Sequence, residues 1–424
     1  MNKKYKISVI GLGYVGLQVA LAFSKKFLTI GYDINQYRIN DLSNNIDKTE
    51  EVKTSEINQS KIIFTNNIVD LKNNNFHIVA VPTPINSKKE PDLEIIKNAT
   101  RSLSKIIKKG DIIVYESTVY PGLTEEICIP ILEKYSKLIN NKDFYIGYSP
   151  ERINPGDRNN TYEKINKIVS AQNKKILNII QKVYQLSTSG KIIKVSSIKV
   201  AEAAKVIENT QRDINVALIN EFSQIFNKMN IDTYEVLSAA STKWNFLNFK
   251  PGLVGGHCIG VDPYYLTYKA KKIGINPKLI LSGRNTNDNM SKYIYKKIIS
   301  NFNKKKKLTI NILGITFKEN CSDIRNSKVL DLINFFNKKN HFINLFDPYI
   351  NEVKVSGKNF IINKHLNQFK NADIILIAVI HNEYLKLSKN FFTKKINSNG
   401  VIFDVKGKFS KLKNTNNNYK YLSL

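Results

Sequence analysis

The glycine run near the N-terminus constrains the fold of this chain more than any other feature. The run Gly11-Leu12-Gly13-Tyr14-Val15-Gly16 follows an apolar strand predicted at residues 6–10 and opens a helical pattern. In a doubly wound sheet the first glycine permits the turn, the second lets the backbone approach a pyrophosphate, and the third packs the helix against the strand. The run therefore predicts a dinucleotide-binding fold, with the phosphates facing the N-terminus of the helix.

A carboxylate after the next strand predicts which dinucleotide is bound. The strand at residues 28–32 ends in Asp33, where a carboxylate accepts hydrogen bonds from ribose hydroxyls and repels a 2′-phosphate. We therefore expect NAD rather than NADP as the cofactor. Arg38 lies close in the sequence and is the cation that could reach a phosphate, so we count it with the cofactor-binding residues.

The same pattern recurs in the second half of the chain. A strand at residues 308–313 is followed by Gly314, a helix at 327–337 and a strand at 342–346 that ends in Asp347. Each half then gives two more buried strands, at residues 76–81 and 111–115 and at residues 372–379 and 401–405. Alternating apolar strands and helices indicate parallel sheets that are covered on both faces. We expect an α/β protein with two doubly wound, Rossmann-like domains.

The stretch between the two halves carries almost no strand signal. A helical pattern without Pro or Gly covers residues 198–229, a loop rich in Gly and aromatic residues covers 241–260, and two helices follow at 263–273 and 278–301. We predict that the long helix joins the end domains and offers a dimerisation surface. The expected domains are residues 1–197, 198–302 and 303–424.

Composition narrows the class of protein. A chain of 424 residues with 42% apolar content fits a globular protein of two or three domains. No apolar run is long enough to span a bilayer, and no secretory signal is present. Cys128, Cys258 and Cys321 are too far apart for a disulfide framework, and the histidines lack the spacing of metal ligands. We therefore expect a reduced, cytoplasmic protein with no membrane partner and no metal site.

The net charge of +30 has two interpretations. One is nucleic-acid binding. The other is a drift in composition towards Lys, Asn and Ile, which spreads positive charge over the whole surface. The lysines are scattered, and no basic stripe alternates with aromatic residues, so we expect no nucleic-acid partner. Such a surface still attracts an anionic small molecule at low salt.

Three motifs follow predicted parallel strands, at the edge where doubly wound sheets bind ligands. They are Val81-Pro82-Thr83-Pro84, Glu116-Ser117-Thr118-Val119-Tyr120-Pro121-Gly122 and Ser149-Pro150-Glu151-Arg152-Ile153-Asn154-Pro155-Gly156. Pro and Gly are also common wherever a strand ends and a loop begins. Glu151 beside Arg152 is also typical of a solvent-exposed ion pair. In the functional interpretation Thr83 and Thr118 contact the ligand, and Glu151 is a base.

Cys258 and two residues of the long helix are the candidate chemical groups. Lys205 and Asn209 are spaced i and i+4 and share a face, where an ammonium and an amide can hold an oxyanion; a polar stripe on a surface helix is the alternative. Cys258 is either a small buried hydrophobe or a nucleophile that a nearby cation activates. With NAD, a nucleophilic cysteine can take a primary alcohol through the aldehyde to the acid.

These motifs give the chain an end-to-end resemblance to the UDP-glucose/GDP-mannose dehydrogenase family. The residues that carry the resemblance are the run Gly11 to Gly16 with Asp33, Ser117-Thr118-Val119-Tyr120-Pro121-Gly122, Ser149-Pro150-Glu151-Arg152, Glu202-Ala203-Ala204-Lys205 with Asn209, Gly255-Gly256-His257-Cys258 with Asp262, and Gly314-Ile315-Thr316-Phe317-Lys318 with Asp323 and Arg325. The segments Thr242-Lys243-Trp244-Asn245-Phe246 and 251–266 are similar to the branch that acts on UDP-N-acetylhexosamines.

The resemblance implies a catalytic role for six residues. Cys258 would form a thiohemiacetal and then a thioester. Lys205 and Asn209 would stabilise oxyanions. Asp262 and Thr118 would order the water near the reacting carbon, and Glu151 would act in thioester hydrolysis.

The resemblance also implies a substrate-binding set. Its members would be Glu151, Arg152, Lys205, Asn209, Lys243, Gly252, Gly255, Gly256, Lys318 and Arg325. The glycines would wrap the nucleotide end of the substrate, and Lys318 and Arg325 would contact it from the C-terminal domain. Many relatives place an arginine, lent by the neighbouring subunit, shortly before the glycine loop. Here the cation that we consider for this place is Lys243, which cannot offer a bidentate fork.

The activity implied is the NAD-dependent, four-electron oxidation of the C6 hydroxymethyl group of UDP-N-acetylglucosamine or UDP-N-acetylgalactosamine to the uronic acid. The product would serve surface polysaccharides, and the enzyme would be a homodimer or a higher homo-oligomer. A UDP-glucose or UDP-N-acetylmannosamine 6-dehydrogenase is the alternative within the same chemistry. A non-catalytic NAD or nucleotide-sugar sensor is an alternative from another class, but a sensor has no use for Cys258, Lys205 and Glu151 together.

Overall fold

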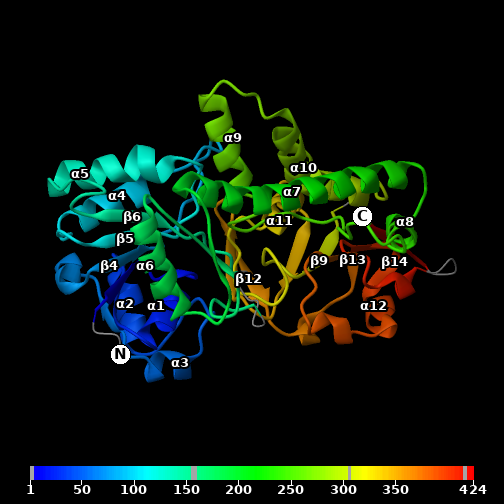
Figure 1. Ribbon diagram of the computed structural model, residues 1–424. Helices are drawn as coiled ribbons and strands as arrows, with labels where there is room; N and C mark the ends of the chain where they lie inside the picture. The colour runs from blue at the N-terminus through cyan, green and yellow to red at the C-terminus, as the bar shows by residue number, and fades with distance from the viewer. Residues whose placement is uncertain (1–3, 154–159, 304–306, 414–417) are drawn as a thin grey trace. The chain divides into compact units, whose positions relative to one another are not determined.

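The computed structural model describes residues 4–153, 160–303, 307–413 and 418–424 (Figure 1). The chain divides into two compact units. Unit 1 is Met1–Asn209 with Tyr264–Asn276, and unit 2 is Thr210–Pro263 with Pro277–Leu424. Within the described residues, no helix is both long enough and apolar enough to cross a membrane. The bounds of the three domains that we expected from the sequence remain a prediction.

Unit 1 is built on one eight-stranded sheet in the order β3-β2-β1-β4-β5-β6-β7-β8. Its strands are β1 Lys6–Ile10, β2 Leu28–Tyr32, β3 Ile63–Thr65, β4 Phe76–Val79, β5 Ile112–Tyr115, β6 Tyr145–Tyr148, β7 Lys167–Ala171 and β8 Ile192–Lys194. The first six strands are parallel and have the order of a dinucleotide-binding sheet. Strand β7 then runs antiparallel to β6.

The helices of unit 1 connect these strands. They are α1 Gly16–Ser24, α2 Gln36–Ser43, α3 Thr54–Gln59, α4 Glu94–Ser104, α5 Ile129–Ser136, α6 Lys174–Gln185, α9 Asp262–Lys272 and the first part of α7 Ile198–Lys228, with short helical turns η1 Ile68–Asn73 and η2 Thr124–Cys128. Strands β4 and β5 are buried along their whole length. That is why they are apolar at every position instead of alternating with polar residues.

Unit 2 holds a seven-stranded sheet in the order β11-β12-β10-β9-β13-β14-β15. Its strands are β9 Thr309–Leu313, β10 Phe342–Phe346, β11 Glu352–Val355, β12 Lys358–Asn363, β13 Ala372–Ile377, β14 Ile396–Asp404 and β15 Tyr419–Ser423. Apart from β11, which is an antiparallel edge strand, the order repeats that of the first six strands of unit 1. The predicted fold class is therefore confirmed.

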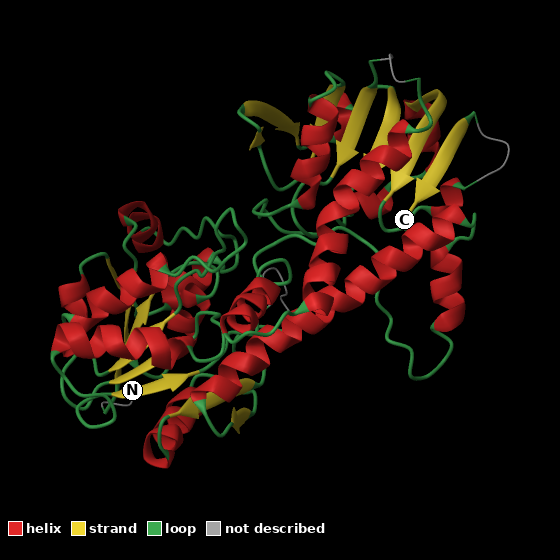
Figure 2. Cartoon of the chain, turned by 90° about the horizontal axis from the view of Figure 1, so that it is seen from above, coloured by secondary structure: helices red, strands yellow, loops and turns green. Residues whose placement is uncertain are grey.

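The helices of unit 2 surround this sheet (Figure 2). They are the second part of α7, α8 Thr233–Ala240, α10 Lys278–Ile299, α11 Lys328–Asn337 and α12 Lys389–Lys395, with short turns η3 Leu366–Gln368, η4 Tyr384–Lys386 and η5 Ser410–Leu412. Successive side chains of β13 enter different apolar clusters. Ile374 packs with Met290 of α10, whereas Ile375 packs with Phe392 of α12. Both faces of the sheet are therefore covered.

The first glycine turn of unit 1 is closed by two backbone hydrogen bonds. Gly11 has a φ of +91° and donates its N–H to the carbonyl of Tyr32 at 2.8 Å. The next N–H, of Leu12, donates to Oδ2 of Asp33 at 2.8 Å. The turn thus depends on a glycine after β1 and on an acid after β2.

Unit 2 has the same turn at the equivalent place. Gly314 has a φ of +80° and donates its N–H to the carbonyl of Phe346 at 2.8 Å. The N–H of Ile315 donates to Oδ2 of Asp347 at 2.7 Å. The duplication seen in the sequence therefore extends to individual hydrogen bonds.

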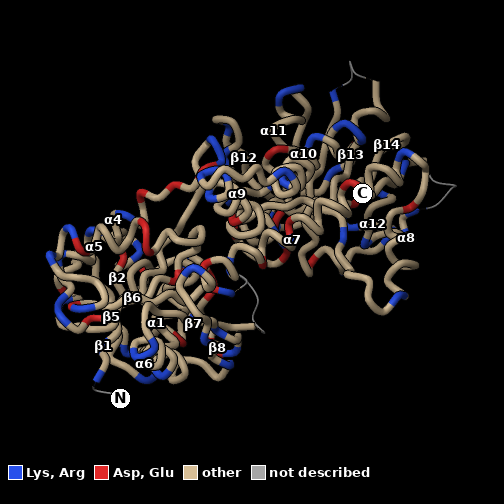
Figure 3. Tube along the Cα trace, turned by 45° about the horizontal axis from the view of Figure 1, so that its top comes forward, with Lys and Arg blue, Asp and Glu red and all other residues tan. Residues whose placement is uncertain are grey.

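Several element boundaries differ from the prediction. Strand β4 ends at Val79, two residues early, because the chain leaves the sheet before Pro82, which has no N–H to pair. Strand β14 begins at Ile396, five residues early. The hairpin of β11 and β12 and the antiparallel β7 had no clear signal in the sequence. The lysines and arginines lie on many elements of each unit, with acidic residues between them (Figure 3).

Candidate functional site

The three glycines of the first loop have different spatial surroundings. A Cβ on Gly16 would lie 1.7 Å from the carbonyl oxygen of Gly11, because the start of α1 packs directly on the turn. A Cβ on Gly13 would meet nothing within 4 Å. Gly16 therefore serves the packing of the fold, whereas Gly13 leaves an open approach to the backbone, as a pyrophosphate requires.

This difference predicts two separable defects. We expect Gly16→Ala to lower the free energy of unfolding by about 3 kcal/mol or more, because the backbone has to move apart to accept the methyl group. Gly13→Ala should leave the melting temperature within a few degrees of wild type and raise KM for NAD about tenfold or more. Thermal melting and cofactor titration of the two variants check this. A normal KM for NAD in Gly13→Ala would contradict the assignment of this loop.

Tyr14 and Val15 complete the loop. Val15 is the N-cap residue of α1, and a valine side chain has no acceptor for the first N–H groups of a helix. Those groups are thus suited to an anionic ligand.

Asp33 and Arg38 lie on either side of the loop backbone. Oδ1 of Asp33 accepts from the N–H of Asn35 at 2.9 Å, and its other oxygen supports the turn. Nε of Arg38 donates to the carbonyl of Leu12 at 2.8 Å, and its NH1 pairs with Asp47 at 2.8 Å. Arg38 therefore supports the loop. Its pairing with Asp47 offsets its attraction for a 2′-phosphate. Its contact with the cofactor remains a prediction.

A serine links the segments that follow β4 and β5. Oγ of Ser117 donates to the carbonyl of Val81 at 2.7 Å, and the hydroxyl of Tyr148 donates to the carbonyl of Ser117 at 3.1 Å. Thr83 and Thr118 flank this link and are each half-buried. Both threonines thus lie at the carboxyl edge of the sheet, as the sequence predicted.

Glu202 fixes the turn that follows Thr118. Its carboxylate accepts the backbone N–H of Gly122 at 2.5 Å and that of Thr124 at 3.0 Å. Burial raises its pKa to about 7, although both N–H bonds act in the other direction. Lys205 and Asn209, further along α7, are also buried. These residues therefore do not form an exposed polar stripe on a surface helix.

Glu151 and Arg152 point to different partners. Glu151 is buried, and Nζ of Lys167 lies 3.3 Å from its Oε2. Arg152 pairs with Glu208 of α7 at 2.8 Å and donates to the carbonyl of Asn166 at 3.1 Å. The two side chains are not a solvated pair with each other. The end of this motif, residues 154–156, lies outside the described residues.

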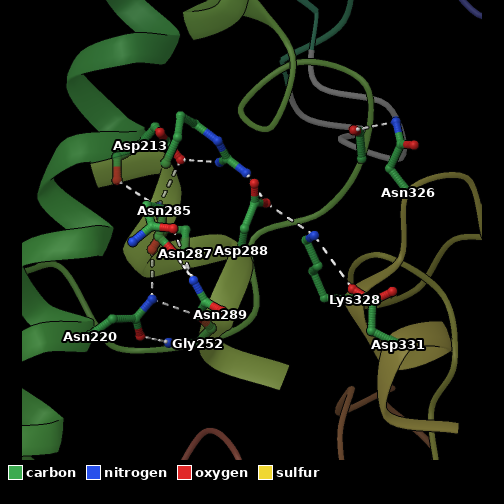
Figure 4. A network of polar contacts seen from close by, with 12 residues as sticks. Asp213, Asn220, Gly252, Asn285, Asn287, Asp288, Asn289, Asn326, Lys328 and Asp331 are labelled. Carbon is green, nitrogen blue, oxygen red and sulfur yellow. Dashed lines mark hydrogen bonds and ion pairs between the residues drawn. The ribbon is translucent and has the colours of Figure 1, made fainter. Parts of the chain in front are cut away.

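In unit 2, an asparagine of α7 holds the loop of residues 251–262 (Figure 4). The N–H of Gly252 donates to Oδ1 of Asn220 at 2.8 Å, and Nδ2 of Asn220 donates back to the carbonyl of Gly252 at 3.0 Å. Nδ2 of Asn326 donates to the carbonyl of Gly256 at 3.1 Å. A Cβ on Gly255 would lie 2.5 Å from the carbonyl of Asn326. These glycines allow the loop to lie closely against its neighbours.

A buried polar network continues from Asn220 (Figure 4). Nδ2 of Asn220 also donates to Asn287 at 2.8 Å, and Asn287 donates to Oδ1 of Asp213 at 2.8 Å. Arg284 pairs with Asp213 at 2.6 Å and with Asp288 at 2.6 Å. Burial raises the pKa of Asp213, and the positive charge of Arg284 acts against that rise. This network joins α7 to α10 beneath the glycine loop.

Cys258 lies in a turn that leads into α9. Its carbonyl accepts the N–H of Val261 at 3.0 Å and that of Asp262 at 2.8 Å. The cysteine is half-buried, whereas Asp262 is buried. Cys258 is thus not part of a closed apolar core, which favours the nucleophile interpretation.

The carboxylate of Asp323 holds two side chains of unit 2. Nε2 of His257 lies 2.9 Å from its Oδ2, and Arg325 makes two parallel bonds to its carboxylate at 3.0 and 2.8 Å. Burial would raise the pKa of Asp323, but the hydrogen bonds from His257 and Arg325 bring it well below its usual range. Asp323 therefore orients Arg325. The sequence signal for Asp323 was its position between Lys318 and Arg325 in the C-terminal motif.

Sequence reasoning missed Lys406, which follows β14. Its ammonium nitrogen would be 3.5 Å from a Cβ on Gly252, and it lies 3.8 Å from Glu319. No motif marked it, because it is one of many lysines. Lys318 is half-buried and follows β9, while Lys243 is exposed in the turn after α8. Substrate contacts by Lys318, Arg325 and Lys243 remain predictions.

Asp347 of unit 2 is not available to bind a ribose in the way that Asp33 of unit 1 is. Asp347 is fully buried. Its Oδ2 faces Nε2 of His381 at 3.0 Å in addition to the N–H of Ile315, and its Oδ1 accepts the N–H of Tyr349 at 2.9 Å. The acid that would bind a ribose is thus occupied within the fold, and only unit 1 has the complete dinucleotide loop.

The doubly wound sheet, the open glycine loop and the half-exposed Asp33 define unit 1 as the cofactor domain of a dinucleotide-dependent oxidoreductase. Family models agree for three segments. Residues 5–188 match the NAD binding domain, 199–289 the central domain and 311–411 the UDP binding domain of the UDP-glucose/GDP-mannose dehydrogenase family. The chain belongs to this family. It is an NAD-dependent nucleotide-sugar dehydrogenase, and its cofactor is NAD.

Individual relatives cover nearly the whole chain. Protein CapL of Staphylococcus aureus is 51% identical over 414 residues, 96% of each chain. A UDP-N-acetyl-D-glucosamine 6-dehydrogenase of Pseudomonas aeruginosa is 47% identical over 95% of this chain and 97% of its own. The solved structure of a UDP-D-ManNAc dehydrogenase from Pyrococcus horikoshii is 27% identical, with a TM-score of 0.87 and 98% of each chain covered.

Proposed function

We propose that the enzyme oxidises the C6 hydroxymethyl group of UDP-N-acetylglucosamine or UDP-N-acetylgalactosamine to the carboxylate. The observation that carries the proposal is Cys258, half-buried in a glycine loop that is anchored at Gly252 and Gly256. The relative named for UDP-N-acetyl-D-glucosamine is closer in sequence than the structure named for UDP-D-ManNAc. UDP-N-acetylmannosamine and UDP-glucose are the alternative substrates.

The residues of the first loop fit NAD. The open space at Gly13 admits the pyrophosphate, the N-terminus of α1 faces it, and Asp33 accepts from the ribose. Two NAD molecules, bound one after the other, would each accept one of the two hydrides that leave the substrate carbon. We propose that Thr83 and Thr118 contact the cofactor from the edge of the sheet.

We propose that the protein's own side chains carry out the steps other than hydride transfer. The thiolate of Cys258 adds to the aldehyde and holds the carbon as a thiohemiacetal and then as a thioester. Lys205 and Asn209 stabilise the negative oxygen of each tetrahedral species. Asp262 and Thr118 orient water, and Glu151 takes a proton from water during hydrolysis.

The UDP end of the substrate is assigned to unit 2. Lys318, Arg325 and Lys406 bring three cations to the carboxyl edge of the second sheet, where they suit a diphosphate. Gly252, Gly255 and Gly256 would follow the nucleotide with their backbone. Arg152 and Lys243 are further candidate contacts.

A homodimer is also part of the proposal. Four exposed apolar residues follow one another at spacings of three and four: Leu218, Phe222 and Ile225 of α7, and Met229 directly after it. Such a row on one helix face is suited to a second copy of the chain. We further propose a cytoplasmic location, where the free NAD and UDP-sugar substrates would be available.

The test is the product and the stoichiometry with a panel of UDP-sugars. We expect two NADH per sugar and the uronic acid, with the highest kcat/KM on a UDP-N-acetylhexosamine. One NADH per sugar with aldehyde as the end product would refute the four-electron reaction. A preference for UDP-glucose would leave the chemistry intact and change the substrate.

A further inference from the structure

Unit 1 contains a lysine that is completely buried. Lys167, the first residue of β7, has no exposed surface, and its ammonium lies between two carboxylates, 3.1 Å from Glu116 and 3.3 Å from Glu151. The ring of Tyr162 lies 4.3 Å from the same nitrogen. A buried ammonium is costly unless it is paired, so this position requires an explanation beyond surface charge.

The two carboxylates differ in their surroundings. Glu116 is fully enclosed and accepts from the hydroxyl of Tyr184 at 2.6 Å and from that of Tyr162 at 3.4 Å. Burial raises the pKa of Glu116 to about 7, with Lys167 acting against the rise and Glu151 adding to it. Burial lowers the pKa of Lys167, but the two carboxylates outweigh it and the pKa is raised overall. The lysine is therefore charged at neutral pH.

The partners described for the Glu151 carboxylate are all hydrogen-bond donors. One oxygen faces Lys167, and the other accepts the backbone N–H groups of Arg152 and Ile153. Lys167 and the two backbone groups therefore hold both oxygens of Glu151 in one orientation.

We propose that Lys167 is a positioning residue for thioester hydrolysis, which holds Glu151 as an oriented carboxylate, and that Glu116 balances the charge of Lys167. The inference rests on the proposed function, in which Glu151 takes the proton of the attacking water. Water adds to the thioester carbonyl and one of its protons passes to Glu151. The C–S bond then breaks, and the proton passes on to the departing sulfur. The products are the carboxylic acid and the Cys258 thiol, and no electrons are exchanged in this step.

The first experiment compares Lys167→Met with Glu151→Gln, using rapid mixing with NAD and UDP-N-acetylglucosamine. In both variants we expect a burst of two NADH per active site followed by a rate at least about tenfold below wild type. Intact-protein mass should show the uronyl group on the enzyme. Lys109→Met removes an exposed lysine of the same unit, which pairs with Asp143 at 3.4 Å, and should behave as wild type.

The outcomes distinguish a failure of the role proposed for Lys167 from a failure of the hydrolytic role proposed for Glu151. If Glu151→Gln accumulates the adduct and folded Lys167→Met does not, the role of Lys167 is overturned and the proposed function stands. If neither variant accumulates it, the hydrolytic role of Glu151 fails, and the inference fails with it.

A second variant covers the case in which Lys167→Met does not fold. Lys167 and Tyr184 donate to different oxygens of Glu116, so Glu116→Gln keeps an oxygen for one of them, and its amide does not titrate. The groups that face Glu116 are Lys167 of β7, Glu151 after β6, Tyr162 and Tyr184 of α6. We expect the hydrolysis rate of the wild type to show an inflection near pH 7 that is absent from Glu116→Gln. An identical pH profile in the two proteins would overturn the inference.

Discussion

Replacing Cys258 with serine is expected to lower kcat by about 10³-fold or more, because a hydroxyl is a far poorer nucleophile than a thiolate near neutral pH. Binding of the UDP-sugar should be largely kept, since serine and cysteine are nearly equal in size and the loop is held at Gly252 and Gly256. Steady-state kinetics and calorimetric titration of the sugar measure the two effects. The serine of this variant can still form an ester-like adduct slowly, and such an adduct would not contradict the prediction.

The control for this variant is Cys128→Ser. Cys128 is fully buried, and burial raises the pKa of its thiol to about 12, so it stays protonated and has no nucleophilic role. Its replacement should leave kcat unchanged. Near wild-type turnover in Cys258→Ser would return that cysteine to a purely structural role.

Removing the carboxylate of Asp213 should destabilise unit 2 by about 3–5 kcal/mol, because the buried guanidinium of Arg284 loses one carboxylate partner and keeps the one at Asp288. Asp213→Ala leaves the guanidinium of Arg284, which is 2% exposed, without the bond at 2.6 Å. It also removes one acceptor of Asn287, which keeps its bond at 2.9 Å to the backbone carbonyl of the same residue. Thermal and urea unfolding measure the loss.

Asp331→Ala provides a matched comparison at the other end of the same network. Its side chain is half exposed and lies 3.4 Å from Lys328, and such a surface pair contributes about 0–1 kcal/mol. Equal effects of the two substitutions would show that the buried network does not stabilise the unit. We also expect Asp213→Ala to raise KM for the UDP-sugar, because Asn287 supports the asparagine that holds Gly252.

The sequence was sufficient for the parts of the fold that depend on local patterns. Gly11 and Asp33 predicted a turn that the structure closes with hydrogen bonds between neighbouring strands. The repeat at Gly314 and Asp347 predicted the second sheet for the same reason. Apolar strands and glycine turns can be recognised because each requires a particular residue type at a particular place.

The parts that depend on distant pairing could not be predicted. Lys167 is one of 65 lysines and arginines, and its burial follows from Glu116, which is 51 residues away. Asn220 carries no motif, and its bond to Gly252 spans 32 residues. Polar residues of this kind are chosen by the partners that the completed fold brings to them, and a single sequence does not contain that information.

Asp347 also bears on how the two halves of the chain can change during evolution. Its counterpart Asp33 is half-exposed and holds the backbone N–H groups of Leu12 and Asn35, so a substitution there can alter ligand preference and breaks fewer hydrogen bonds than one at Asp347. Asp347 is enclosed and is bonded to His381 and to three backbone N–H groups. A substitution there would disturb the turn itself. Two positions that are equivalent in the two sheets therefore differ in mutational tolerance, and new cofactor specificity is more accessible through the first sheet than through the second.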